Sequence, residues 1–235
     1  MAPSAINPQA KAFNGVCQVH RAEVLSDQSG VDDALVQLPG EAQVVLLFGT
    51  LSPYKGVDLL VDAFARLAGR RPRARLVVAG FPLAGFDLGR ERRRAAELGV
   101  AERVTFVPEY LPSSEVAAWM ELATVAAFPY RSGSQSAAVQ TALTFGVPVV
   151  AAAVGAMPEL LAGVGDAGRA WRVPPEDPEA LAAALEELLA GPAGRETLEE
   201  RRQRAAEIRR RTSWRHAASI LLDTYAEALG REAAT

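Results

Sequence analysis

The sequence predicts an α/β fold, a Rossmann-like parallel sheet of about six strands with helices on both faces and further helices at the C-terminal end. Short apolar runs alternate six times with helical patterns, which is typical of parallel α/β sheets. The apolar runs are continuous, as expected for strands buried on both faces. Almost half of the 235 residues are hydrophobic, so a sizeable core can form without disulfides or metals.

Composition excludes several classes of function. The formal charge of −3 argues against a nucleic-acid-binding protein, and the local arginine clusters alternate with acids as on solvated helix faces. Cys17 is the single cysteine, which favours a reducing compartment, the cytoplasm. His20 and His216 belong to no cluster with metal-ligand spacing, so we expect neither a protein-bound metal nor a cofactor. No signal peptide and no apolar run of about 20 residues is found, so we expect no transmembrane segment.

The chain divides into a leader or linker, residues 1–42, and a Rossmann-like domain, residues 43–235. The leader mixes Pro, Gly, Asn, Ser and Asp without a sustained period. The domain begins with a strand at Gln43–Phe48 that ends at Gly49. A helix follows, in which Leu60, Ala63, Phe64 and Leu67 share one face.

Lys55 and Gly56 stand at the start of this first helix. An ammonium group and free N–H groups at a helix start can together hold a diphosphate. The alternative is that Lys55 is an ordinary surface lysine.

The next two parts of the chain repeat this order of strand, loop and helix, and each such set is called a unit below. Arg75–Ala79 is predicted as a strand, ended by Gly80 and followed by a helix at Asp87–Leu98. Val104–Val107 is the next strand, and Ser113 is expected to cap a helix. The core face of that helix is expected to hold Val116, Trp119, Met120 and Ala123.

The fourth unit has strands at Val125–Phe128 and Val147–Ala151 with a helix between them. The turn that enters this helix, Tyr130–Ser136, is rich in small hydroxylic residues and contains Gly133. A strand, then Gly-Ser-Gln-Ser, then a helix start makes a plausible anion-binding turn, because the first N–H groups are unpaired and positively polarised. The alternative is a capped helix without a ligand.

The last units are shorter. Glu159 falls in the first turn of a short helix, where it is either a dipole-favoured surface acid or a ligand contact. Ala170–Val173 is predicted as a strand, and Asp177-Pro178 as an N-cap followed by proline at the first helical position. Two helices, Glu196–Arg211 and Ser213–Leu229, end the chain.

Four loops follow the C-terminal ends of predicted parallel strands, so they should gather at one edge of the sheet. Ligands of such sheets bind at this edge. These loops are Gly49–Gly56, Gly80–Phe86, Tyr130–Ser136 and Val154–Glu159.

The ordered motifs resemble a known family. GTLSPYKGVDLLVDAF, RLVVAG, RVTFVPEYLPSSEVAAWMELA, FPYRSGSQSAAVQTALTFGVPVVA, VGAMPELL and VPPEDPEALAAAL are similar to the C-terminal, donor-binding domain of group 1 glycosyltransferases of the GT-B fold, family 4-like. The resemblance covers about Val44 to Leu229. It implies a retaining, metal-independent enzyme half that holds a nucleoside diphosphate sugar, the substrate, in a cleft between two Rossmann-like domains.

The resemblance also implies the donor-binding residues. Lys55 is expected to contact the diphosphate, and the Ser134–Ser136 helix start to direct its N–H groups at the same phosphates, where charge develops as the nucleotide departs. The full set of expected donor contacts is Gly49, Lys55, Gly56, Gly80, Tyr130, Ser132, Gly133, Ser134, Gln135, Ser136 and Glu159.

Four departures from the family pattern limit this assignment. Many members pair the lysine with an arginine a few residues earlier, and none stands between Gly49 and Pro53. The Glu-x7-Glu pair of many members falls on Gly133 and Thr141, so no catalytic acid or base is named. The second glycine of a usual Gly-Gly turn is Ala156, and a usual aspartate is Thr124.

The family that the chain resembles has two domains, and the resemblance covers only the donor-binding one. Only some forty unpatterned residues precede Val44, so we expect an acceptor-domain partner or a missing N-terminal domain. The final helix, which in this fold crosses to the first domain, is expected to present apolar residues to it. A cytoplasmic protein is expected, peripheral to the membrane at most through a partner.

Two alternatives to a glycosyltransferase half remain. A non-catalytic sugar-nucleotide-binding or partner subunit is favoured by the missing arginine and glutamates. A dinucleotide-dependent oxidoreductase fits the sheet but lacks the G-x-G-x-x-G turn after the first strand.

Overall fold

The computed structural model of the chain describes residues 38, 41–163, 170–191, 194, 196–211 and 213–229. The expected leader lies outside the described residues except at Leu38, Glu41 and Ala42, and so do Cys17 and His20.

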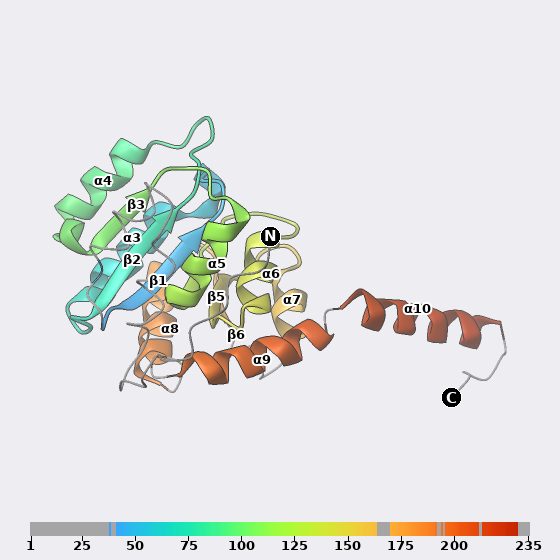
Figure 1. Ribbon diagram of the computed structural model, residues 1–235. Coiled ribbons are helices and arrows are strands. Elements are labelled where there is room, and N and C mark those ends of the chain that lie inside the picture. Colours follow the sequence, from blue (N-terminus) through green and yellow to red (C-terminus); the bar gives the residue numbers. More distant parts are fainter. Residues whose placement is uncertain are drawn as a thin grey trace, which may run out of the picture.

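The described residues form one six-stranded sheet in which every neighbouring pair is parallel, as Figure 1 shows. The strand order is β3-β2-β1-β4-β5-β6. The strands are β1 Gln43–Phe48, β2 Ala74–Ala79, β3 Val104–Val107, β4 Ala123–Phe128, β5 Val149–Ala152 and β6 Ala170–Val173. The predicted Rossmann-like fold is therefore confirmed.

Helices alternate with these strands along the chain. Their bounds are η1 Pro53–Lys55, α3 Val57–Ala68, α4 Leu88–Glu97, η2 Ala101–Arg103, α5 Ser113–Leu122, α6 Ala137–Thr144, α7 Met157–Gly163, α8 Pro178–Ala190, α9 Leu198–Arg211 and α10 Trp214–Ala228, with η1 and η2 being 3-10 turns.

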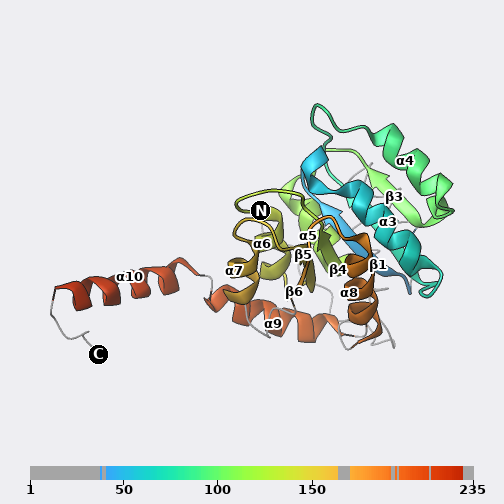
Figure 2. The same ribbon diagram turned by 180° about the vertical axis from the view of Figure 1, so that it is seen from behind.

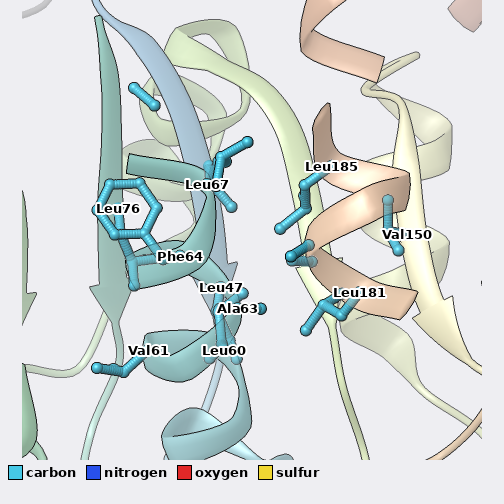
Figure 3. Close-up of a cluster of buried hydrophobic side chains, with 14 of the residues drawn as sticks. Leu47, Leu60, Val61, Ala63, Phe64, Leu67, Leu76, Val150, Leu181 and Leu185 are labelled. Atoms are coloured by element: carbon cyan, nitrogen blue, oxygen red, sulfur yellow. The ribbon is translucent and has the colours of Figure 1, made fainter. Parts of the chain in front are cut away.

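Alternate residues of the strands point to two separate hydrophobic layers. Val45 and Leu47 of β1 pack under α3, α4 and α8, whereas Val44 and Leu46 belong to the layer of α5, α6, α7 and α9. Figure 3 shows the first layer, in which Phe64 and Leu67 of α3 lie over the sheet beside Leu185 of α8. Because successive side chains of a strand alternate, a strand covered on both faces must be apolar throughout, which explains the continuous apolar runs.

Helix starts agree with the predicted caps at some positions and differ at others. The Asp177 carboxylate accepts hydrogen bonds from the amides of Glu179 and Ala180, as Asp177-Pro178 predicts. The predicted cap at Ser113 is wrong, because α5 already begins at Ser113 and Pro112 occupies the N-cap position.

Two strand boundaries also differ from the prediction. Ala123, expected on the face of a helix, is the first residue of β4, which follows α5 without a loop. β5 begins at Val149 and not at Val147, because the Val147 amide donates to the Ala142 carbonyl and so completes the end of α6. The apolar pattern alone does not distinguish these helix ends from strand starts.

Figures 1 and 2 show α10 extending away from the body that holds the sheet. Its large apolar side chains are more than half exposed, and they are Ile220, Leu221, Leu222 and Tyr225, with Leu229 just beyond the helix. Across the described ranges, no helix combines the length and the apolar character needed to span a membrane.

Candidate functional site

The site lies where the order of the strands reverses. β1 and β4 are neighbours in the sheet, and the strands that follow each of them run outward in opposite directions. In open parallel sheets the crevice beyond the C-terminal ends of two such strands is the usual place for a ligand. A cavity of about 600 Å³ opens there. Its walls are Phe48, Gly49, Thr50, Tyr54, Lys55, Val116, Tyr130, Gln135, Ser136, Ala137, Ala138, Thr141 and Phe145.

Lys55 brings a buried positive charge to this cavity. Its side chain is only 6% exposed, and Nζ donates a hydrogen bond of 2.8 Å to the Tyr130 hydroxyl. Nζ lies 4.4 Å from the centre of the Tyr130 ring and 5.6 Å from that of Tyr54. No carboxylate of the described chain pairs with it, and burial lowers its pKa to about 8. An ammonium group that is desolvated without a counter-charge is favourably placed to receive an anionic ligand.

The backbone of η1 fixes the position of Lys55. The amide of Lys55 donates to the carbonyl of Ser52, and Pro53 occupies the first helical position. Gly56 ends the turn with φ of 68°, and a Cβ at this residue would lie 2.1 Å from the Pro129 carbonyl oxygen. Only glycine allows η1 to pack this closely against the end of β4.

Tyr130 links Lys55 to the start of α6. Its hydroxyl lies 3.3 Å from Ser136 Oγ, and its ring stacks edge-on against Phe128 and Tyr54. Burial raises the pKa of the Tyr130 hydroxyl, so this group stays protonated at neutral pH. It can therefore accept a hydrogen bond from Lys55 and donate one to Ser136.

The N-terminus of α6 supplies the second positive element. Ser136 is the N-cap, and its Oγ accepts a hydrogen bond from the amide of Val139. The amides of Ala137 and Ala138 precede the first intrahelical bonds, and both residues line the cavity. A Cβ built on Gly49 would lie 3.8 Å from Lys55 Nζ and 3.7 Å from the Ala138 Cβ, so these two positive elements meet at Gly49.

The predicted gathering of loops at this edge is confirmed by close backbone contacts. A Cβ on Gly80 would lie 2.0 Å from the Gly49 carbonyl oxygen, and one on Gly155 would lie 1.8 Å from that of Gly133. The amide of Ala156 also donates to Ser134 O, at 3.1 Å. Glycines at these positions let neighbouring loops touch through their backbones.

The structure separates the expected donor contacts into two groups. Those in the cavity wall are Gly49, Lys55, Tyr130, Gln135 and Ser136. Those outside it are Gly56, Gly80, Ser132, Gly133, Ser134 and Glu159. Gly56 and Gly80 pack against neighbouring backbone, Ser132, Gly133 and Ser134 are exposed in the loop after β4, and Glu159 is exposed in the first turn of α7.

The start of α3, expected to face the same anion, is already occupied. The Asp58 carboxylate interacts with the amides of Asp58 and Leu59, in the first turn of the helix. Of the two helix starts, it is that of α6 whose residues, Ala137 and Ala138, line the cavity.

Arg131 is an organising residue that sequence reasoning missed. Its guanidinium donates to both oxygens of Asp58, at 2.9 and 2.8 Å, and also to the carbonyl of Pro53. Its backbone amide donates to the Tyr54 carbonyl. These bonds hold the loop after β4 against η1, and they engage Arg131 away from the cavity, so it does not replace the arginine missing near Gly49. No local signal could reveal this pair, because 73 residues separate its members.

Other wall residues were missed although signals for them existed. Thr50 and Tyr54 lie in the loop that was singled out after β1, and Ala137 and Ala138 follow the predicted turn directly. Thr141, which stands where many family members carry a glutamate, also lines the cavity. Among the described residues, no three His, Cys, Asp or Glu side chains are grouped closely enough to hold a metal ion.

Comparisons with known proteins agree with this architecture. The family described as Glycosyl transferases group 1 matches residues 42–191. The D-inositol 3-phosphate glycosyltransferase of Jonesia denitrificans is 34% identical over 80% of this chain and 44% of its own length. The enzyme of the same name from Mycobacterium marinum is 35% identical over 81% of this chain and 39% of its own length. The chain thus spans less than half the length of these two curated relatives.

Solved structures share the fold. Sucrose-phosphate synthase from Thermosynechococcus elongatus superimposes with a TM-score of 0.61 at 28% identity, over 88% of this chain and 50% of that one. Anabaena HepE, crystallised with UDP and glucose, gives a TM-score of 0.64 at 22% identity, over 88% of this chain and 54% of that one. Taken with the family match over residues 42–191, the site geometry leads to one conclusion: the chain belongs to the group 1 glycosyltransferases.

Proposed function

We propose that this chain is the donor-binding half of a retaining, metal-independent glycosyltransferase and holds the diphosphate of a nucleoside diphosphate sugar in the cavity between β1 and β4. Lys55 and the amides of Ala137 and Ala138 bind the phosphates in this proposal. When the sugar leaves the nucleotide, negative charge grows on the β-phosphate, and preorganised donors lower the barrier to that step.

The observation that carries the proposal is the burial of Lys55 without a carboxylate partner. A buried ammonium group destabilises the folded protein unless a ligand repays the cost, so its position beside free helix amides favours an anion-binding role. HepE, which shares the fold, was crystallised with UDP and glucose, which supports a nucleoside diphosphate as the ligand to test.

The acceptor would be bound by a second half. The chain spans 44% and 39% of two curated relatives, which leaves more than half of their length without a counterpart here. The exposed apolar residues of α10, such as Leu222 and Tyr225, would contact that half. Any association with a membrane would then come from this partner.

Calorimetric titration with UDP, GDP and ADP tests the diphosphate site. We expect micromolar to millimolar affinity for at least one nucleotide, unchanged by EDTA, and a loss of at least tenfold in Lys55→Gln, since a charged hydrogen bond contributes about 1.5–3 kcal/mol.

Arg92→Gln is the matched control, because it removes one positive charge from an exposed position of α4. Equal weakening in Arg92→Gln and Lys55→Gln, or no binding of any of the three nucleotides at millimolar concentration, would refute the diphosphate site.

A second candidate function is a non-catalytic sugar-nucleotide-binding subunit. The specific observation in its favour is that Gly133 and Thr141 stand where many family members carry glutamates. Mixing the chain with candidate acceptor-domain proteins and a sugar nucleotide separates the two functions. Turnover that gives a product of unchanged anomeric configuration supports the enzyme, and nucleotide binding without turnover in any mixture supports the subunit.

A further inference from the structure

The buried cation in the wall of the diphosphate cavity is a lysine, in a chain that otherwise relies on arginine. Of its 25 lysine and arginine residues, only Lys11 and Lys55 are lysines. A guanidinium group is planar and always charged, whereas an ammonium group is compact, directs three N–H groups apart and can lose its proton. Lys55 can therefore bond a protein group and still offer N–H groups to a ligand, but only its protonated form attracts an anion.

The direction of the hydrogen bonds around Lys55 follows from what each group can donate. An ammonium group only donates, so the Tyr130 hydroxyl accepts from Nζ at 2.8 Å. The hydroxyl proton of Tyr130 needs a different acceptor, and Ser136 Oγ, at 3.3 Å, is the one that the described chain offers. Tyr130 is 2% exposed, so an unbonded proton there would be costly, and Tyr130 therefore donates to Ser136.

Ser136 anchors this chain of bonds to the start of α6. Its Oγ also accepts a hydrogen bond from the Val139 amide, so the N-cap geometry fixes the oxygen to which Tyr130 donates. Because a hydroxyl that donates becomes a better acceptor, the bond to Ser136 strengthens the bond from Lys55. We propose that Tyr130 is a positioning residue for the diphosphate site, whose hydroxyl, oriented by Ser136, holds the ammonium form of Lys55 in place for the anionic ligand. This role rests on the proposed function, because Tyr130 acts on the nucleotide only through Lys55.

The cavity wall contains few other groups that could set the charge of Lys55. Among the residues that line the cavity, only Tyr54, Lys55 and Tyr130 titrate, and those contributed by α5, α6 and the loop after β1 do not. Burial lowers the pKa of Lys55 to about 8. Removing the hydroxyl that accepts from the ammonium group should lower the pKa of Lys55 further.

NMR reads this change directly, because protein labelled with ¹³C in its lysines alone contains only two labelled residues. The signal that disappears in Lys55→Gln belongs to Lys55. Without nucleotide, we expect the Lys55 signal of the wild type to titrate near pH 8 and that of Tyr130→Phe about 1 pH unit lower, since a charged hydrogen bond is lost. Tyr130→Phe keeps the ring whose centre lies 4.4 Å from Nζ, so the hydroxyl alone is tested.

Calorimetric titration connects the charge of Lys55 to binding, with whichever of UDP, GDP and ADP binds most tightly. We expect Tyr130→Phe to bind this nucleotide more weakly than the wild type does, by a factor that is about fivefold larger at about pH 8.5 than at about pH 6.5. The reason is that Lys55 loses its proton at lower pH in the variant. The titration of the nucleotide itself is common to both proteins and cancels in this comparison.

Further variants separate the hydroxyl chain from a general loss of structure. Ser136→Ala should lower the titration midpoint of Lys55 by less than Tyr130→Phe does, and Ser136→Thr, which keeps the hydroxyl, should restore it. Tyr225→Phe removes an exposed hydroxyl from α10 and is the control. Thermal melting verifies that each variant folds.

A purely structural effect of Tyr130→Phe would leave the Lys55 midpoint unchanged and weaken binding equally at both pH values, and either result refutes the role of Tyr130. A lowered midpoint in a protein that binds none of the three nucleotides refutes the diphosphate site, and with it any part of Tyr130 in nucleotide binding, although the bond to Lys55 stands. The two failures are therefore distinguishable.

Discussion

Buried positively charged side chains have different kinds of partner at the two edges of the sheet. At the N-terminal edge, Arg201 donates to the carbonyls of Met120, Glu121 and Ala123, and Arg204 pairs with Glu196 and donates to the Gly146 carbonyl at 2.6 Å. At the C-terminal edge, Lys55 has the Tyr130 hydroxyl and two aromatic rings.

The difference separates structural charge from charge held ready for a ligand. The arginines of α9 hold this helix against the sheet, and their charges are met by acceptors of the protein itself. Lys55 has one neutral hydroxyl as its acceptor and no carboxylate among the described residues, so its burial costs stability that an external anion would offset. The predictions below test this contrast, from the largest expected effect to the smallest.

Arg204→Ala should lower the free energy of unfolding by about 3–5 kcal/mol, because it removes a salt-bridge partner from Glu196, whose side chain is 2% exposed. Denaturant unfolding followed by circular dichroism measures the change. Arg202→Ala, at a side chain 53% exposed, is the control and should change stability by less than about 1 kcal/mol. Equal effects of the two substitutions would contradict a structural role for the Arg204 pair.

In contrast to the Arg204 pair, charged Lys55 should lower the free energy of unfolding, and the pH dependence of stability should show this. Its pKa in the folded protein is about 8, below its ordinary value of 10.5. Between these two values the unfolded chain binds more protons at this residue, so the free energy of unfolding should rise with pH by about 1.4 kcal/mol per unit. Below pH 8 both states are protonated, and the contribution no longer changes.

The difference between wild type and Lys55→Met isolates this contribution, because all other titrating groups are shared. Unfolding is measured from pH 7 to 11 for both proteins. A difference that stays constant over the whole range would show that Lys55 titrates normally and is not desolvated.

Arg131→Gln should loosen the contact between η1 and the loop after β4. Removing the two bonds to Asp58 should cost about 1.5–3 kcal/mol of stability and weaken nucleotide binding, because Lys55 and the start of α6 lose their fixed spacing. Chemical unfolding and calorimetric titration measure the two effects.

Asp58→Asn and the double substitution complete a cycle for this pair. If Arg131 acts through Asp58, the double variant should lose little more than either single variant. Fully additive losses would indicate that the two residues act separately.

Ser136→Ala should have the smallest effect, a loss of about 1 kcal/mol from removal of the α6 cap. The contact with the Tyr130 hydroxyl is lost as well, so a modest decrease in nucleotide affinity should accompany it. Thermal melting and calorimetric titration test both effects. Ser134→Ala, in the exposed part of the loop, should stay within about 0.5 kcal/mol of the wild type.

Local sequence determined most of the secondary structure. Three strands, Gln43–Phe48, Val104–Val107 and Ala170–Val173, have the bounds that their apolar runs predict. The Asp177 cap is also as predicted. These features depend on neighbouring residues, since side-chain periodicity and capping act within a few positions of the chain. The family resemblance rests on the same local motifs.

Only the tertiary structure decided how the site is assembled. The place of β1 beside β4, the bond between Lys55 and Tyr130 across 75 positions, and the bond between Arg131 and Asp58 across 73 positions have no local signal. The same structure turns the start of α3 toward Asp58 and leaves that of α6 open to the cavity. The physical reason is that crossover connections in a parallel sheet bring distant segments together, and the charge around Lys55 depends on which segments meet there.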